Sequence, residues 1–374
     1  MTTAELIDAT PGAKQDAAIV YQRALQNSLL LAGVFLVGAL LFRPAVGLVI
    51  MWNILIPTAP ALIVVAPGLW RNICPMATLS LLPRRLGLSR KRIPSRRWTG
   101  LLGLTSVSAL FLIVPLRHIL LNTSGSMTAL MLLLAAGIAV ATGIAFEWRS
   151  GWCTSLCPIH PVEKLYGLSP PITVKNMRCD SCRKCTAICP DSIRSMTPVV
   201  TGPSALDRWV GHGFTGSFVG FIFGWYQVPD YPGHIGAVEI AAGYLWPFGC
   251  AAVSLLLYAA TRKWLCQSKL ARHALIRIFA AAAVSCYYWY RIPALTGFGP
   301  YSDTGLLYDL TGVLPNWTPV ASRILTTSFF AWFLLLRPSP NTSWMIRPVF
   351  DATQIKPAMW QRSERQKLAV CEAQ

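Results

Sequence analysis

The amino-acid sequence predicts an all-α polytopic membrane protein with about eight transmembrane helices and a cytoplasmic, cysteine-rich segment between the fourth and fifth of them. Three observations lead to this fold class. Hydrophobic residues make up 54% of the 374 residues and charged residues only 13%, whereas soluble domains carry about 25% charged residues. Apolar stretches long enough to cross a hydrocarbon core of about 30 Å recur along the chain. Most of the eleven cysteines lie close together near the middle of the chain.

The amino terminus is expected to remain in the cytoplasm. It carries Glu5, Asp8 and Asp16 and lacks the basic start, short apolar core and small-residue cleavage site of a secretory signal. Crossings of about 20 residues each then follow. These spans are expected near residues 26–42, 45–70, 98–117, 127–147, 208–228, 237–260, 272–290 and 319–336.

The basic residues give this topology an orientation. Cytoplasmic loops carry an excess of Lys and Arg, and the spans above place 29 of the 33 Lys and Arg residues on the cytoplasmic side. The net charge of +18 therefore reflects orientation and does not indicate a nucleic-acid partner. We expect a multi-pass protein of the cytoplasmic (inner) membrane with both termini inside. The remaining basic residues, on the outer side, are Arg43, Arg117, Arg291 and Arg323.

This topology divides the chain into four regions. Residues 1–147 form an amino-terminal four-helix membrane region with a basic cytoplasmic loop at 71–97, and residues 148–207 form the cysteine-rich cytoplasmic segment. Residues 208–336 form a second four-helix membrane region, and 337–374 a basic cytoplasmic tail. The densest basic run lies within the 71–97 loop and is expected to bind anionic lipid headgroups or to dock an acidic redox protein.

The predicted fifth span contains the pattern GxGxxG, which in dinucleotide-binding folds follows a strand and contacts phosphate. No strand precedes it here, so the pattern is expected to have no such role. Gly216, Gly220 and Gly224 recur at every fourth position instead. This spacing predicts a smooth face for close helix packing.

None of the acidic residues falls near the middle of a predicted span. Transporters coupled to protons or ions usually need carboxylates at membrane depth. The distribution of acidic residues therefore disfavours that class.

The sequence RCDSCRKCTAICP contains four cysteines, Cys179, Cys182, Cys185 and Cys189, followed by Pro190. The spacing CxxCxxCxxxCP lets a short loop direct successive thiolates toward the corners of an iron–sulfur cluster. Zinc also binds CxxC pairs, but a tetrahedral site would not explain the third cysteine at the same interval or the final CysPro. Disulfides are disfavoured because this segment is expected in the reducing cytoplasm.

A CxxxCP sequence formed by Cys153 and Cys157 lies upstream of this run, and another CysPro pair begins at Cys74. The segments around Cys74 and Cys157 each follow a predicted span and end in Gly-Leu-Ser, which indicates a degenerate internal repeat. If three cysteines of the run share one [4Fe–4S] cluster, either Cys157 or Cys189 could be the fourth ligand. A second cluster is then possible from Cys153, Cys189 and Cys74, with His160 or a water completing it.

These spans and motifs resemble the NapH, NosR and CcoG group of membrane-bound ferredoxin-type proteins over about residues 45–195. The resemblance implies two CxxxCP loops after membrane helices, cytoplasmic [4Fe–4S] clusters, and electron transfer between the quinone pool or a soluble donor and a partner enzyme. The chain departs from that group in two ways. Trp70 replaces the leading cysteine of the first CxxxCP, and the second ferredoxin run is absent.

Two further features suggest other ligands. His212 and His273 are expected at similar depth near the inner face, and His118 and His234 near the outer face, so haem b is disfavoured but not excluded. The long aromatic stretch at 287–317 is expected to form an interfacial aromatic belt. A quinone pocket or an external partner could use the same residues.

The sequence therefore favours a membrane-anchored iron–sulfur electron-transfer protein, a subunit of an oxidoreductase system more than a stand-alone enzyme. The expected partners are membrane lipid, a quinone or quinol, and a redox protein on the cytoplasmic side. Two alternatives remain open. The protein could be a redox-active maturation factor for another metalloenzyme, or a membrane scaffold stabilised by zinc.

Overall fold

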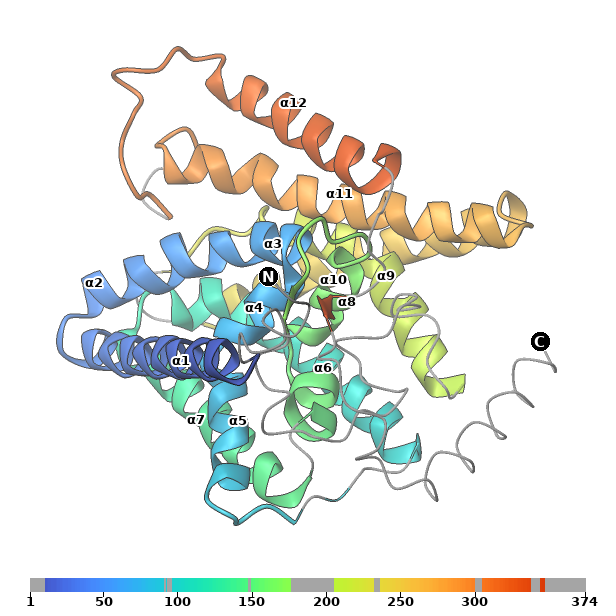
Figure 1. Ribbon diagram of the computed structural model, residues 1–374. Coiled ribbons are helices and arrows are strands. Elements are labelled where there is room, and N and C mark those ends of the chain that lie inside the picture. The colour runs from blue at the N-terminus through green and yellow to red at the C-terminus, as the bar shows by residue number, and fades with distance from the viewer. Residues whose placement is uncertain are drawn as a thin grey trace, which may run out of the picture.

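The computed structural model describes residues 11–90, 92, 96–146, 149–175, 205–231, 236–299, 305–337 and 344–346, and these ranges are mainly helical (Figure 1). The helices in the first half of the chain are α1 (Pro11–Phe42), α2 (Pro44–Leu48), α3 (Ile56–Val65), α4 (Pro67–Ile73), α5 (Pro75–Arg85), α6 (Arg96–Leu116), α7 (Gly125–Ala145) and α8 (His160–Tyr166), with π-helical segments η1 (Val49–Leu55), η2 (Arg117–Leu121) and η3 (Arg149–Leu156).

The second half contains four long helices and a short parallel pairing of two strands. Strand β1 (Val174–Lys175) pairs with β2 (Met345–Ile346), so the chain after α8 lies beside the chain that follows the last span. The helices are α9 (Ala205–Trp225), α10 (Ala237–Trp264), α11 (Lys269–Leu295) and α12 (Thr318–Ala331), the last continued by the π-helical segment η4 (Trp332–Leu336).

Seven candidate membrane spans are found within the described ranges, which agrees with a polytopic α-helical membrane protein. They correspond to seven of the eight predicted crossings. The spans are Arg23–Phe42, Pro44–Val65, Gly100–Leu121, Gly125–Ala145, Ala237–Trp264, Lys269–Leu295 and Thr318–Leu336.

The remaining predicted crossing, 208–228, corresponds to α9, which has 21 residues but is not among the seven candidate spans. Its environment explains the difference. Eleven of its residues are buried, and it contacts α10, α11, α6 and α8. Because neighbouring helices cover so much of its surface, glycine, serine and threonine can replace the large apolar residues that a lipid-facing span requires.

Glycines on α9 allow α10 to approach closely, as the every-fourth spacing predicts. A Cβ atom at Gly216 would overlap Tyr258 and Leu255, and one at Gly220 would overlap the backbone carbonyl of Cys250. The close approach is accompanied by a hydrogen bond, since the Ser254 hydroxyl donates to the Gly216 carbonyl at 2.6 Å. The packing role predicted for this glycine face is confirmed.

Proline begins several of the short helices in the first half of the chain. Pro44, Pro67 and Pro75 each occupy one of the first positions of a helix. Proline restricts the residue before it to non-helical conformations, and Ala66 and Cys74 accordingly have ψ angles of 68° and 120°. The same steric rule therefore ends one helix and begins the next at each of these points.

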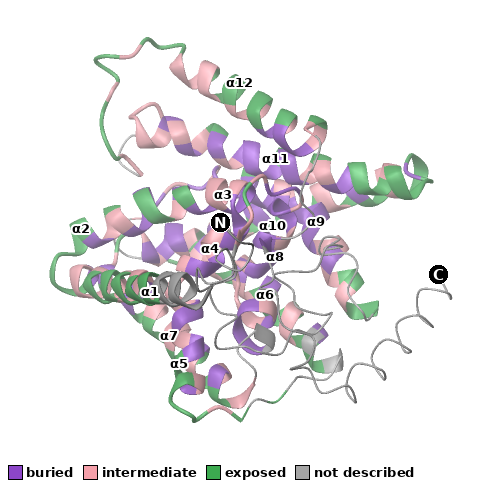
Figure 2. Cartoon of the chain, in the orientation of Figure 1, coloured by how far each residue is buried: buried purple, intermediate pink, exposed green. Residues whose placement is uncertain are grey.

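Many residues on the outer faces of the helices are exposed (Figure 2), and large apolar side chains are among them. Phe35 on α1, Leu256 on α10 and Leu325 on α12 are 69%, 70% and 69% exposed. A soluble protein rarely exposes continuous apolar surface of this kind. These faces are suited to contact with lipid, and the aromatic core around α9 supplies the internal packing.

We expect Gly220→Ala to destabilise the protein by about 1–3 kcal/mol, because the added methyl group overlaps backbone that cannot move independently of α10. Gly213→Ala is the matched control on the same helix, since a Cβ atom there meets nothing within 4 Å. Thermal unfolding in detergent measures both. Equal stability of the two variants would contradict the packing described for Gly220.

Candidate functional site

The two CysPro sequences form similar local structures. Cys74 N–H donates to the Trp70 carbonyl at 3.0 Å, and the Cys74 carbonyl accepts from Thr78 N–H at 3.2 Å. Cys157 N–H donates to the Trp152 carbonyl at 2.9 Å, and its carbonyl accepts from His160 N–H at 3.0 Å. Each cysteine thus lies at the junction of two helical segments, as an internal repeat would produce.

Cys74, Cys153 and Cys157 lie together, and we call these three residues the CysPro cluster. They pack in one apolar group with Ala77, Leu81, Ala139 and Trp152. Burial and the nearby charges of Glu163, Cys74 and Cys153 raise the pKa of the Cys157 thiol well above its ordinary value. Without a bound cation the thiol form is therefore favoured, whereas a coordinated metal would favour the thiolate.

A buried ion pair between Arg71 on α4 and Glu163 on α8 lies beside this cluster. Arg71 donates to Glu163 Oε2 from Nε at 2.9 Å and from Nη2 at 2.7 Å. The same Nη2 also donates to the Cys153 carbonyl at 3.0 Å, and Trp70 Nε1 donates to Glu163 Oε1 at 2.8 Å. One guanidinium group therefore connects α4, α8 and the backbone of the cysteine-bearing loop.

The pKa values of Glu163 and His160 both lie below their ordinary values, but the physical causes differ. Burial alone would raise the pKa of Glu163, but the charge of Arg71 outweighs it and holds that pKa below its ordinary value. Burial, together with the positive charges of Lys164 and Arg71, lowers the pKa of His160 to about 3. At neutral pH this site therefore contains a carboxylate and a neutral imidazole.

His160 Nδ1 lies between a donor and an acceptor, 2.8 Å from Arg71 Nη2 and 3.4 Å from Glu163 Oε2. The two hydrogens of Nη2 also serve Glu163 Oε2 and the Cys153 carbonyl, so these contacts are compatible with either tautomer of the ring. The other ring nitrogen is Nε2. This Nε2 atom is buried and has no hydrogen-bond partner within the described ranges. An unsatisfied buried polar atom next to three thiols is compatible with a polar or charged group binding there.

Other side chains hold the CysPro cluster in place. The Ser106 hydroxyl on α6 donates to the Cys157 carbonyl at 2.6 Å. The Trp344 ring covers Arg71, with the guanidinium carbon 4.7 Å from the ring centroid, and its indole N–H donates to the Gly167 carbonyl at 2.7 Å. Residues from four distant parts of the chain therefore surround the cluster.

The structure does not test all the predicted ligands. Cys179, Cys182, Cys185 and Cys189 lie outside the described residues, whereas Cys153, Cys157 and Cys74 lie inside and are brought together. Among the residues that are described, no group of three or more His, Cys, Asp or Glu side chains is positioned to hold a metal ion.

The histidines considered as haem ligands have other surroundings. His212 Nδ1 lies 2.9 Å from the Tyr258 hydroxyl, and His273 is exposed. His118 is hydrogen-bonded to Asp230, and its predicted counterpart His234 lies outside the described residues. The pairing of His118 with His234 is therefore not tested by the structure.

Comparisons with known proteins add no family to this description. No family model, curated protein or solved structure matches the chain. The class that fold and composition define is a multi-pass α-helical membrane protein, and the function must be argued from its own residues.

Sequence reasoning missed the groups that support the cluster, namely Arg71, Ser106, Glu163 and Trp344. One signal was available, because Arg71 and Glu163 are charged residues adjacent to the two copies of the CysPro repeat. Nothing in the spacing showed that they would meet, since their contact depends on how α4 and α8 pack.

We expect Arg71→Gln and Glu163→Gln each to destabilise the protein by about 3–5 kcal/mol, because each leaves its buried partner without a counter-charge. The double variant Arg71→Met/Glu163→Leu should lose less than the sum of the two single losses, since no uncompensated charge remains. Thermal unfolding in detergent measures these differences.

Lys269→Gln, which removes an exposed charge at the start of α11, serves as the control and should change stability by less than about 0.5 kcal/mol. Strict additivity of the Arg71 and Glu163 single variants would show that the two side chains do not interact as described.

Proposed function

We propose that the protein is a membrane-anchored iron–sulfur electron carrier that passes electrons between a quinone pool or soluble donor and a partner redox enzyme. The observation that carries this proposal is the meeting of Cys74, Cys153 and Cys157 from two distant CysPro segments. A second support is the run from Cys179 to Cys189, which has the spacing of ferredoxin ligands and follows closely in sequence.

The surroundings of the CysPro cluster are compatible with an iron–sulfur cluster. Cysteine thiolates are the usual ligands of such clusters, and three cysteines share one apolar group here, although their side chains are not positioned to hold a metal ion in this structure. Arg71 supplies a positive charge at the Cys153 carbonyl, which favours the negative charge of thiolate ligands. His160 Nε2 adds a buried ring nitrogen that lacks a protein partner in the described ranges. When bound, an iron–sulfur cluster would supply one-electron transfer.

The structure supports one division of the ligands over another. Cys157 is held by hydrogen bonds at both its N–H and its carbonyl, in the same apolar group as Cys74 and Cys153. This arrangement favours Cys157 acting with those two cysteines in a second site. Cys189 would then complete the first [4Fe–4S] cluster with Cys179, Cys182 and Cys185.

Orientation in the membrane follows from charge. With the predicted topology, the CysPro cluster and the cysteine run lie on the cytoplasmic side of the inner membrane, where most Lys and Arg residues are expected. A partner redox protein would dock at this face. Electrons would be exchanged within the inner leaflet unless a quinone, a haem or a partner subunit extends the path across a core about 30 Å thick.

Metal and sulfide analysis of anaerobically purified protein tests this proposal. We expect iron and acid-labile sulfide in comparable amounts, together with an EPR signal after dithionite reduction. A sharp Soret band in the absorption spectrum would show haem as well. Zinc without iron would overturn the electron-carrier proposal and favour a structural metal scaffold.

Cysteine variants test the assignment of ligands. We expect Cys182→Ser to abolish the EPR signal of the first [4Fe–4S] cluster, and Cys74→Ser to leave that signal and most of the iron in place, because Cys74 belongs only to the auxiliary site. Cys250→Ser, on α10 and outside the CysPro cluster, is the control and should retain all the iron.

Cys157→Ser and Cys189→Ser decide between the two candidates for the fourth ligand. Loss of the EPR signal in Cys189→Ser but not in Cys157→Ser would support the division proposed here. Equal loss of iron from Cys74→Ser and Cys182→Ser would mean that Cys74 is an essential ligand and that the two sites are not independent.

A further inference from the structure

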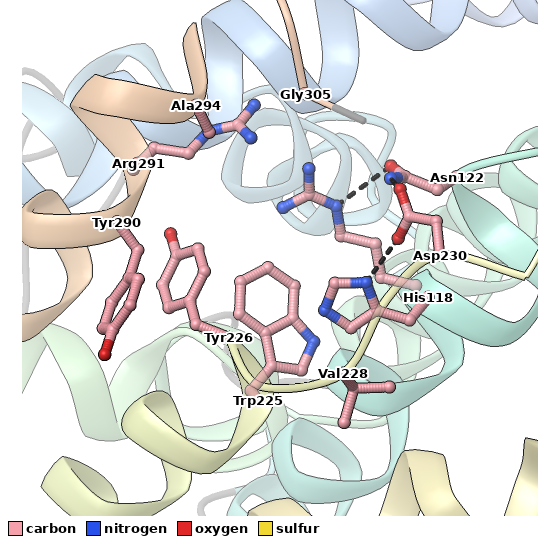
Figure 3. A pocket seen from close by; sticks show the side chains of 11 residues that line it. His118, Asn122, Trp225, Tyr226, Val228, Asp230, Tyr290, Arg291, Ala294 and Gly305 are labelled. Atoms are coloured by element: carbon pink, nitrogen blue, oxygen red, sulfur yellow. Dashed lines mark hydrogen bonds and ion pairs between the residues drawn. The ribbon is translucent and has the colours of Figure 1, made fainter. Parts of the chain in front are cut away.

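A pocket with an aromatic wall is lined by Arg117, His118, Tyr226, Asp230 and Arg291, among others (Figure 3). A largely helical stretch leads from Asn53, which contacts Arg291 in the pocket, to Arg71, which contacts the CysPro cluster. At 1.5 Å per residue this stretch is roughly 27 Å long. The pocket is small, and its empty space reaches about 400 Å³ only when the open mouth is counted. With the predicted topology it faces the outer side of the membrane.

Two buried arginines line this pocket. Arg117 is 5% exposed and Arg291 is 2% exposed, although they come from η2 and α11, which are far apart in sequence. Two of the four basic residues expected on the outer side, Arg117 and Arg291, therefore line this one pocket. Burying two guanidinium groups together is costly unless negative charge compensates them.

The surroundings of Arg117 leave only part of its guanidinium group available to a ligand. Its guanidinium carbon lies 4.9 Å from the Trp52 ring centroid and 5.1 Å from that of Trp225. Its Nε donates to Asn122 Oδ1 at 3.1 Å. Within the described ranges its two terminal nitrogens have no acceptor. The two indole rings and the Asn122 side chain therefore occupy part of the Arg117 guanidinium group. The edge with the two terminal nitrogens stays available, and this edge is the part of an arginine that binds oxyanions in a bidentate manner.

Arg291 is held by backbone and amide oxygens. Its Nη2 donates to the Trp52 carbonyl at 2.6 Å and to Asn53 Oδ1 at 2.7 Å. Its Nε is buried without a partner in the described part of the chain. Gly305 is required beside it, because a Cβ atom there would overlap Arg291 Nη1. These contacts position the group but provide no negative charge.

A single carboxylate is found among the described lining residues. Asp230 accepts hydrogen bonds from His118 and Asn122, so its two oxygens are already engaged. Burial would raise the pKa of Asp230, but its hydrogen bond with His118 and the charges of His118 and Arg117 hold the pKa below its ordinary value. One carboxylate therefore faces two guanidinium groups, and these residues carry an excess of positive charge.

Two further polar atoms in the pocket lack partners in the described ranges. They are the Tyr226 hydroxyl and His118 Nε2, both buried. Figure 3 shows Tyr290, Tyr226, Trp225 and His118 in a row along one side, with the Tyr226 and Tyr290 rings stacked at 4.9 Å. The pocket therefore presents a guanidinium edge, a hydroxyl and an imidazole from different directions, against an aromatic wall.

From this arrangement we propose that the pocket binds a phosphate group, carried by a phospholipid headgroup or free in solution. A phosphate oxyanion would neutralise the excess charge of Arg117 and Arg291. Its tetrahedral oxygens could accept from several directions at once, whereas a planar carboxylate has only two oxygens. The location also fits, because helix ends at the membrane interface lie at the depth of phospholipid headgroups.

Two measurements on the full-length protein in a phosphorus-free detergent distinguish the sources of the phosphate. Phosphorus analysis and native mass spectrometry detect a phospholipid that remains after extensive washing. Titration calorimetry of the washed protein with inorganic phosphate detects free binding. Either a retained phospholipid or measurable phosphate affinity supports the proposal, and the two results identify which source is used.

Variants locate the binding in this pocket. Arg117→Gln is expected to weaken phosphate affinity, or lipid retention, by at least about tenfold, since it removes a charge-assisted contact. Tyr226→Phe removes a single hydroxyl and should weaken binding by about fivefold while preserving the fold. Arg43→Gln removes an exposed basic residue expected on the same side, outside the pocket lining, and should bind like the unmodified protein.

Three results would overturn the proposal. The first is the absence of both retained phospholipid and phosphate affinity in the unmodified protein. The second is unchanged binding in both Arg117→Gln and Tyr226→Phe. The third is binding of a short-chain quinone analogue without binding of phosphate, which would assign the pocket to a different ligand class. Iron content is measured separately, so failure of this proposal leaves the electron-carrier proposal untouched.

Discussion

The arrangement around the cysteines depends on the buried ion pair between Arg71 and Glu163. Two charges removed from water are tolerated only when they are paired and hydrogen-bonded, so α4 and α8 must meet at this point. The same guanidinium group donates to the Cys153 carbonyl and contacts His160 Nδ1 at 2.8 Å. Because Arg71 must stay paired with Glu163, its side chain fixes the position of one CysPro segment relative to the other.

The steric effect of proline complements this electrostatic constraint. A residue before proline avoids the helical conformation, and Cys74 is accordingly extended at the junction of α4 and α5. The cysteine side chain is thereby placed between two helices instead of along one of them. Repetition of this device at Cys157 gives two equivalent junctions, and the ion pair brings these junctions together.

The two ends of the helices have contrasting chemistry. At one end, thiols and a neutral imidazole lie beside a fully paired arginine, an environment compatible with soft metal chemistry. At the other, Arg117 and Arg291 share a pocket with a single engaged carboxylate among the described lining residues. The helices between them are packed through the aromatic and glycine-rich surface of α9. The candidate redox site and the candidate anion site thus lie near different ends of the helical stretch between Asn53 and Arg71.

The sequence by itself determined the features that depend on local physics. Apolar length located seven spans, and the spacing of Gly216, Gly220 and Gly224 identified a packing face. These predictions succeeded because hydrophobic length and the helical period act within a few residues. The function inferred from the cysteine run remains a proposal, since Cys179–Cys189 lies outside the described residues.

Only the tertiary structure decided which distant groups meet. It placed Cys74 with Cys153 and Cys157, paired Arg71 with Glu163, and surrounded α9 with other helices. It also brought Arg117 and Arg291 into one pocket, although the sequence indicated only that both belong to the outer side. Contacts of this kind arise from the packing of whole helices, and no local spacing rule encodes them.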